Sequence, residues 1–401
     1  MSEQLKNKIE ANDTSINKLL KEQKFYIDYF QREYRWEEKH MKQLVEDLTS
    51  TFLRSFSKEH GRAEVANYRN YYLGPSVFSV DPDTNKKSII DGQQRITSLT
   101  LFLIFLNHKQ ESVSSKVSIS ELIFSEKFGE KSFNMSDEYR DECLKALFEE
   151  GAYTLKEDDN ETVVNMVNRY ADIEIIFPEE IDDHALPYFI DWLIQNVVIV
   201  EIIAYSDENA YIIFETMNDR GMNLTATEML KGFVLSKISD RTKRDEINSI
   251  WKKLMQELHE YADNADQTFF QAWFRGKYAV SIRPGKAGSE NKDYELIGSE
   301  FHRWFKDKHE PLFKLNNSED FYHFFKNEFP FFVKAYMRAF DAWYDLDEKI
   351  PHAYYTRYWG IADSLEDPML LAPINYGDTP SIVDAKFDFV CRYIETFTVR
   401  S

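Results

Sequence analysis

The stretch from Ser88 to Leu106 constrains the fold of this chain more than any other. Its β-branched start predicts a short strand, and its apolar run from Leu99 to Leu106 is long enough for a buried helix. The residues between the two are mostly polar: Asp91, Gly92, Gln93, Gln94, Arg95, Ile96 and Thr97. The sequence therefore predicts a strand that passes directly into a helix N-terminus, with polar side chains gathered at the junction.

This junction has two chemical interpretations. A helix N-terminus presents backbone N–H groups and the positive end of a dipole, so it suits an anion such as a phosphate. Arg95 lies in the predicted first turn and would add a bidentate contact to the same anion. Alternatively, Asp91 caps the helix and Gly92 permits the turn. Local chemistry alone favours neither interpretation.

The composition is typical of a helix-rich globular chain. Its 401 residues exceed one typical domain, and only 13 glycines and 11 prolines argue against a sandwich of short strands. No apolar run is long enough to span a membrane, and the first residues lack the pattern of a signal peptide. Cys143 and Cys391 lie far apart, which disfavours a disulfide or a cysteine metal site and predicts a cytoplasmic location.

The net charge of −20 limits how this chain can meet nucleic acid. A field of that sign repels DNA on average, so any DNA contact needs a local basic patch, whereas one helix end and an arginine are enough for a nucleotide. The nearest candidates for a basic patch are Arg241, Lys243, Arg244, Arg275, Lys277, Arg283 and Lys286. A solvated helix face is the alternative interpretation of these residues.

The predicted fold class is α+β and helix-dominated, with every strand in residues 1–240. Strands are predicted at residues 24–27, 71–80, 87–90 and 196–203, and helices at 15–21, 37–57, 207–217 and from the junction to residue 107. Residues 1–20 are predicted as a lead-in, and residues 110–180 as a helical insertion of polar character. Residues 241–401 show only helical patterns rich in aromatic residues, which predicts a second, all-helical domain.

Several common catalytic motifs are missing. The loop around Gly285 lacks the spacing of a phosphate-binding P-loop and has no strand before it. The chain also has no nucleophile elbow and no zinc-protease motif. Two further polar clusters remain, and each lies at the end of a predicted element: Gln31, Arg32, Tyr34 and Trp36; Asn218, Asp219 and Arg220. Taken singly, the aromatic residues of the first cluster are better explained by core packing, and the second cluster by a helix C-cap.

The three polar clusters together resemble a known family. The order is Phe-Gln-Arg-x-Tyr-x-Trp, then Tyr-Tyr-Leu-Gly with Ile-Ile-Asp-Gly-Gln-Gln-Arg-Ile-Thr-Ser-Leu, then Phe-Glu-Thr-Met-Asn-Asp-Arg-Gly-Met-Asn-Leu-Thr. It resembles the N-terminal domain of GmrSD-type modification-dependent restriction enzymes, which also occurs in SspE-like phage-defence proteins. The resemblance covers roughly residues 10–240.

The resemblance implies a fold similar to ParB and sulfiredoxin, with binding and hydrolysis of nucleoside triphosphates. It ties this activity to recognition of modified phage DNA, through sugar-modified cytosine or backbone phosphorothioate. The implied catalytic residues are Asp91, Gln93, Gln94 and Arg95. The implied nucleotide-binding residues are Gly92, Thr97, Gln31, Arg32, Asn218 and Arg220. We call the three clusters the first, second and third motifs in chain order, and Gly221 also matches the third motif. The implied sensors of the DNA modification are Tyr34, Gln31 and Trp36.

Individual roles follow from this assignment as hypotheses. Arg95 and the helix N-terminus would hold phosphate oxygens, Asp91 would place Mg²⁺ or a water, and Gln93 or Gln94 would orient the attacking water. The expected partners are modified DNA and an HNH-type nuclease domain or subunit, and the sequence is also compatible with a homo-oligomer.

No HNH element is present and the last residues lie within an apolar helical pattern. We therefore expect either a chain cut short of its nuclease domain or the sensor subunit of a split system. Two other classes of function stay open: a nucleotide- or DNA-gated binding module without turnover that controls a nuclease, and a purely structural adaptor.

Overall fold

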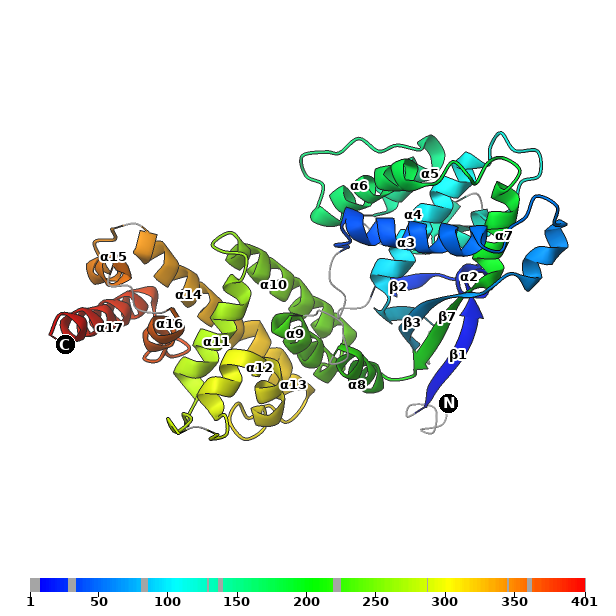
Figure 1. The fold of residues 1–401 in the computed structure, drawn as a ribbon. Helices are drawn as coiled ribbons and strands as arrows, with labels where there is room; N and C mark the ends of the chain where they lie inside the picture. The colour runs from blue at the N-terminus through cyan, green and yellow to red at the C-terminus, as the bar shows by residue number, and fades with distance from the viewer. Residues whose placement is uncertain are drawn as a thin grey trace. The chain divides into compact units, whose positions relative to one another are not determined.

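The computed structural model describes residues 8–27, 34–80, 86–127, 130–135, 140–218, 225–286, 288–344, 346–358 and 363–400. The chain forms two compact units, Met1–Gly221 and Met222–Ser401 (Figure 1). The sequence predicts a boundary near residue 240, one helix later. The helix between these two positions, α9 (Ala226–Lys237), packs against helices of the second unit.

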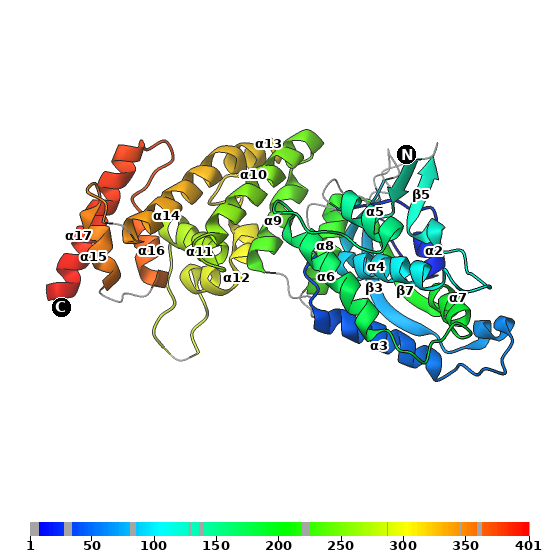
Figure 2. The same cartoon turned by 90° about the horizontal axis from the view of Figure 1, so that it is seen from above.

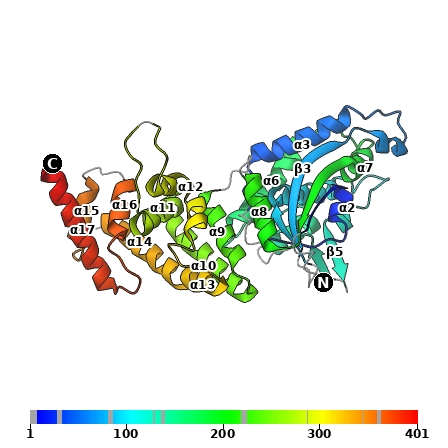
Figure 3. The same cartoon turned by 90° about the horizontal axis from the view of Figure 1, so that it is seen from below.

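The first unit is built on a mixed five-stranded sheet with the order β1-β7-β3-β4-β2. In this order, its strands are β1 (Ile9–Ser15), β7 (Val197–Ala204), β3 (Tyr71–Val80), β4 (Lys87–Asp91) and β2 (Phe25–Ile27). The pairs β3–β7 and β2–β4 are parallel, whereas β1–β7 and β3–β4 are antiparallel. The mixed sheet confirms the predicted α+β class, and Figure 3 shows β3 and β7 side by side.

One strand of this sheet differs from the prediction, and a second confirms it. Residues 9–15 were expected to belong to a lead-in, but they form β1 at the edge of the sheet. The sequence of β1, Ile-Glu-Ala-Asn-Asp-Thr-Ser, is polar because most of its side chains face water, so it lacks the alternation that reveals a half-buried strand. The break expected in β3 is confirmed, because its register against β7 shifts between Tyr72 and Gly74.

Helices cover the sheet and supply most of the core of the first unit. They are α2 (Ile16–Leu20), α3 (Glu38–Leu53), the 3₁₀-helix η1 (Arg62–Asn67), α4 (Gln93–Lys109), η2 (Ser120–Leu122), α5 (Asp141–Glu150), α6 (Glu161–Ile176), α7 (Leu186–Asn196) and α8 (Asp207–Asn218). The apolar run predicted as a buried helix is confirmed as α4, which is fully buried from Leu99 to Leu106 apart from slight exposure of Phe105. None of the helices in the described part of the chain is long and apolar enough to cross a bilayer.

The segment 110–180 is more than a helical insertion. It also contains a two-stranded hairpin of β5 (Phe124–Lys127) and β6 (Glu130–Phe133), which the sequence analysis missed. The strands are short and carry charged residues, so they resemble loops in sequence. The same segment supplies α6, which packs against both α3 and α4 (Figure 2). The segment therefore contributes directly to the core of the first unit.

The second unit is helical, as predicted, with no strand among its described residues. Its remaining helices are α10 (Arg241–His259), α11 (Ala265–Tyr278), α12 (Asp293–Lys308), α13 (Ser318–His323), the π-helical turn η3 (Phe324–Glu328), α14 (Phe329–Tyr344), α15 (Pro351–Tyr358), α16 (Asp363–Leu371) and α17 (Pro380–Arg400). Its core is aromatic: the buried ring of Trp273 stacks on Phe324 and Phe332 at centroid distances of 5.6 and 5.1 Å.

Candidate functional site

The predicted junction lies where β4 ends at Asp91 and α4 begins at Gln93. Gly92 is the N-cap residue and has φ +99°, a left-handed conformation that favours glycine. A Cβ atom on Gly92 would lie 2.3 Å from Oγ of Ser76 on the neighbouring strand β3. The N-cap position is Gly92, one residue after Asp91, and its left-handed backbone confirms the prediction that Gly92 permits the turn.

Arg95 is fixed in the first turn of α4 by groups on two strands. Its Nη2 lies 3.6 Å from Oδ2 of Asp91, and its Nη1 donates a hydrogen bond to the carbonyl oxygen of Leu73 at 3.2 Å. A Cβ atom on Gly74 would lie 2.8 Å from Nη1 of Arg95, so the guanidinium lies directly over this glycine. Its side chain is 21% exposed, which leaves part of the group open to an approaching anion.

The two glutamines of the junction have different surroundings. Gln93 is 1% exposed and points into the protein. Gln94 is half-buried, and its Oε1 accepts a hydrogen bond from the backbone N–H of Arg35 at 2.8 Å. The structure therefore brings the start of α4 together with the end of the first sequence motif.

Tyr34 is fully buried beside α4. Its hydroxyl lies 2.7 Å from Oγ of Ser98, and burial raises the pKa of the phenol above its ordinary value. The hydroxyl therefore stays protonated at neutral pH. Tyr34 is placed for packing, so the prediction that it senses modified DNA stays a prediction that requires the side chain to leave this position. Trp36 is partly exposed, and its ring stacks on His40 at a centroid distance of 5.9 Å.

Two buried arginines near this site escaped the sequence analysis. Nη1 of Arg140 donates to Oγ1 of Thr97 at 3.4 Å, so the predicted nucleotide ligand Thr97 faces Arg140 in the core. Arg169 on α6 donates to the carbonyl oxygen of Trp36 at 2.9 Å. The positive charges of both arginines lower the pKa of Tyr34, partly offsetting the effect of burial. Nothing in the polar segment 110–180 marks either residue by spacing or motif.

Several predicted site residues lie outside the described part of the chain. These are Gln31, Arg32, Asp219, Arg220 and Gly221. Asn218 is the last residue of α8, and its side chain also lies outside the described set. Helix α8 packs against β3, β4 and β7, so the element that carries the third motif covers the strands next to the junction.

The arrangement has the chemistry of an anion site with little means of holding a metal by itself. The α4 N-terminus supplies backbone N–H groups and Arg95 supplies a guanidinium. Among the described residues, no three histidine, cysteine or acidic side chains gather where they could bind a metal. Asp91 is the one acidic side chain of the Asp-Gly-Gln-Gln-Arg motif. A single carboxylate fits a magnesium ion whose other ligands come largely from the phosphates of a nucleotide.

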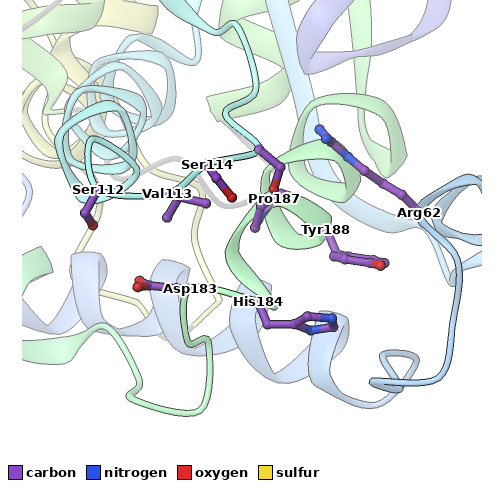
Figure 4. A pocket seen from close by; sticks show the side chains of 9 residues that line it. Arg62, Ser112, Val113, Ser114, Asp183, His184, Pro187 and Tyr188 are labelled. Atoms are coloured by element: carbon purple, nitrogen blue, oxygen red, sulfur yellow. The ribbon is translucent and has the colours of Figure 1, made fainter.

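Elsewhere in the first unit is a cavity of about 530 Å³ (Figure 4). It lies between η1, the loop after α4 and the start of α7. Its lining includes Arg62, Ser112 to Ser115, His184 and Tyr188, and no residue of the three motifs contributes. Arg62 forms an ion pair with Asp191, as Arg95 does with Asp91, so the motif residues rather than the arginine charge distinguish the two places. We therefore place the candidate site at the α4 junction.

The seven candidates for a basic patch have different surroundings. Burial lowers the pKa of Arg275 and of Lys277, and Lys277 donates to the carbonyl oxygens of Ala372 and Ile374. Lys243 pairs with Glu319. These contacts engage three of the seven residues within the second unit, whereas Arg241, Arg283 and Lys286 are exposed.

Comparison with known families adds one finding. The sequence model of the family described as the N-terminal domain of the GmrSD restriction endonuclease matches residues 16–235, slightly more than half of the chain. The match includes the junction at Asp91–Arg95 and the two other polar clusters, Gln31–Trp36 and Asn218–Arg220. No curated protein matches the chain.

Proposed function

Because this chain belongs to the family of GmrSD restriction endonuclease N-terminal domains, and thus to a restriction system, we propose that its first unit binds and hydrolyses nucleoside triphosphates. The hydrolysis is coupled to recognition of modified phage DNA in the cytoplasm, and it controls an HNH-type nuclease domain or partner subunit. The domain acts as the sensor of the system.

One observation carries this proposal: Arg95 is held by Asp91 and Leu73 beside the N-terminus of α4. Phosphoryl transfer needs little covalent chemistry from a protein, and its catalysis comes mainly from positioning and from positive charge near the transferred group. A guanidinium fixed before the nucleotide arrives loses little entropy on binding, so its stabilisation of the transition state is available in full.

The other motif residues have roles that suit their surroundings. Asp91 places a divalent ion or a water, and the magnesium ion that accompanies a nucleotide would neutralise phosphate charge there. Gln93 or Gln94 orients the attacking water. Gln94, which is half-buried and holds Arg35 through its Oε1, is better placed for this than Gln93, which is 1% exposed. The first and third motifs complete the nucleotide site through Gln31, Arg32, Asn218 and Arg220. Trp36 and Gln31 meet the DNA modification.

Substitution of Arg95 tests the proposal. We expect Arg95→Ala to lower kcat/KM for phosphate release about 10²- to 10³-fold, the usual effect of removing one fixed donor to a transition state. Arg95→Lys should keep only part of the wild-type kcat/KM, because an ammonium group cannot form the bidentate contact of a guanidinium. The assay measures phosphate release from each of the four triphosphates, with modified and with unmodified DNA.

The matched control is Arg54→Ala, since Arg54 is an exposed arginine at the end of α3 in the same unit. It should release phosphate at the wild-type rate. An Arg95→Ala variant as active as wild type would contradict the assignment of the site.

A binding module without turnover is the second candidate function. Both glutamines of the motif are already engaged, since Gln93 is buried and Gln94 accepts a hydrogen bond from Arg35. This favours a binding module, because hydrolysis needs a group that orients the attacking water. Titration with a nucleotide would then show saturable binding but no phosphate release. A chain that binds no nucleotide at all would instead be a structural adaptor.

A further inference from the structure

We infer that α6, which carries none of the three motifs, is a positioning element for the nucleotide site. Three of its side chains, Thr162, Asn165 and Arg169, hold the segment Tyr34–Trp36 against α4. Arg32 and Gln31 lie two and three residues before Tyr34 in the chain, so the position of the segment limits where they can reach. The inference rests on the proposed function and assigns to α6 the contacts that position the nucleotide site.

Side chains from α6 occupy the backbone polar groups on both sides of Tyr34. Its N–H donates to Oγ1 of Thr162 at 3.2 Å, and its carbonyl oxygen accepts from Nδ2 of Asn165 at 2.9 Å. Nη1 of Arg169 donates to the carbonyl oxygen of Trp36 at 2.9 Å. The three contacts span 128 to 133 residues of sequence, so folding of the whole first unit creates them.

Helix α4 holds the same segment from the other side. Oε1 of Gln94 accepts from the N–H of Arg35, and Oγ of Ser98 meets the hydroxyl of Tyr34. The segment belongs to no helix or strand, so these side chains supply the partners of its backbone groups, among which the N–H of Tyr34 is buried. The position of the first motif relative to the Asp-Gly-Gln-Gln-Arg motif is therefore set by hydrogen bonds from two helices.

The packing of α6 does not depend on this polar contact. Its core face consists of Val163, Met166, Tyr170 and Ile173, all buried. Its polar face consists of Thr162, Asn165, Arg169 and Asp172, spaced three and four residues apart. Arg169 is oriented by an ion pair with Asp172, three residues further along the helix. Thr162 is buried with the core face, whereas Asn165 is half-buried beside it. A substitution at Asn165 therefore changes none of the four core side chains and should leave the helix docked.

The substitution Asn165→Asp tests the inference. It keeps the size of the side chain but replaces the amide donor with a carboxylate that repels the carbonyl oxygen of Tyr34. We expect kcat/KM for phosphate release to fall about 10- to 100-fold, the effect of a small misplacement of groups at a reaction centre. The thermal midpoint should stay within the range of the control.

The matched control is Asn168→Asp, which introduces the same charge one turn along α6 at an exposed position. It should behave as wild type. Arg169→Ala should resemble Asn165→Asp, and Arg169→Lys, which keeps one donor, should recover part of the activity. Because Asn165 acts through the first motif, Asn165→Asp combined with Arg32→Ala should be no less active than Arg32→Ala alone.

Hydrogen exchange of the amides of Tyr34 and Arg35 gives a readout that does not depend on hydrolysis. Asn165→Asp should speed their exchange, whereas Asn168→Asp should not. Unchanged exchange would overturn the inference whatever the activity of the protein. Unchanged phosphate release in Asn165→Asp, with Arg95→Ala inactive, would overturn it while the proposed function stands. Faster amide exchange in Asn165→Asp together with a fully active Arg95→Ala would mean that the proposed function fails, while the role of α6 in holding the segment Tyr34–Trp36 stands.

Discussion

At the scale of single residues, glycines decide the geometry of the candidate site. Gly92 turns the chain from β4 into α4 with φ +99°, and Gly74 has φ +106° beneath Arg95. Both also lack the Cβ atom that would occupy space taken by a neighbour. The motif therefore needs its glycine for two physical reasons, a left-handed backbone and close contact with Ser76.

We expect Gly92→Ala to destabilise the first unit by about 2–4 kcal/mol, adding the cost of left-handed backbone to that of overpacking. Chemical denaturation followed by circular dichroism measures this. Gly61→Ala is the control, because its Cβ atom would meet nothing closer than 3.8 Å at an ordinary backbone angle. Equal stability of the two variants would refute the structural role of Gly92.

At the scale of elements, buried polar residues fix where helices begin. Asp293 starts α12, and one carboxylate oxygen accepts from Nε1 of Trp304 at 2.9 Å. The other oxygen accepts from Oγ of Ser281 at 2.8 Å and from the N–H of Val280 at 3.2 Å. The carboxylate thus ties the long loop between α11 and α12 to the helix that follows it.

This contact predicts a pH-dependent stability. Burial alone would raise the pKa of Asp293, but the hydrogen bonds from Trp304, Ser281 and Val280 outweigh it and lower the pKa below its usual value. The stabilisation is therefore complete above about pH 4, the unfolded pKa, and is lost as the pH falls through the lower folded pKa.

We expect Asp293→Asn to destabilise the second unit by about 1–3 kcal/mol at neutral pH, since hydrogen bonds to a charged acceptor are lost. The difference from wild type should shrink as the pH falls below about 4. Urea denaturation at several pH values measures it. Asp263→Asn, at an exposed position without such contacts, is the control and should match wild type throughout. If the difference in free energy of unfolding between Asp293→Asn and wild type did not change with pH, the ionised carboxylate would not be the source of the stabilisation.

At the scale of the whole molecule, charge opposes contact with DNA. The net charge is −20, and several basic side chains of the second unit are engaged by carboxylates or carbonyl groups. Affinity for DNA comes mainly from basic groups that neutralise phosphates. The recognition of DNA that we propose for this chain therefore depends on a specific feature such as a base or backbone modification.

We expect unmodified duplex DNA to bind with a Kd of about 10⁻⁵ M or weaker at physiological salt, within the range of non-specific binding. Fluorescence anisotropy with a labelled duplex at several salt concentrations measures the Kd and the salt slope. A duplex carrying the cognate modification is the comparison and should bind more tightly. Submicromolar binding of the unmodified duplex would refute the argument from charge.

The sequence by itself determined the local structure around the site. The strand–Asp-Gly–helix order, the strand at residues 196–203 and the capping box at Thr225 all depend on neighbouring residues, so periodicity and turn chemistry were enough. It also determined the α+β class and the family. The edge strand β1 and the hairpin β5–β6 were missed, because polar strands carry no apolar alternation.

Only the tertiary structure decided what the motif residues touch. Gln94 reaches Arg35 across 59 residues of sequence, and Tyr34 reaches Thr162 across 128. No local pattern encodes such pairs, because they depend on how α6 packs beside α4. For the same reason, a tyrosine predicted to face DNA lies in the core. Short-range chemistry identified the motif, and long-range packing determined which of its residues are exposed, buried or held by a neighbouring helix.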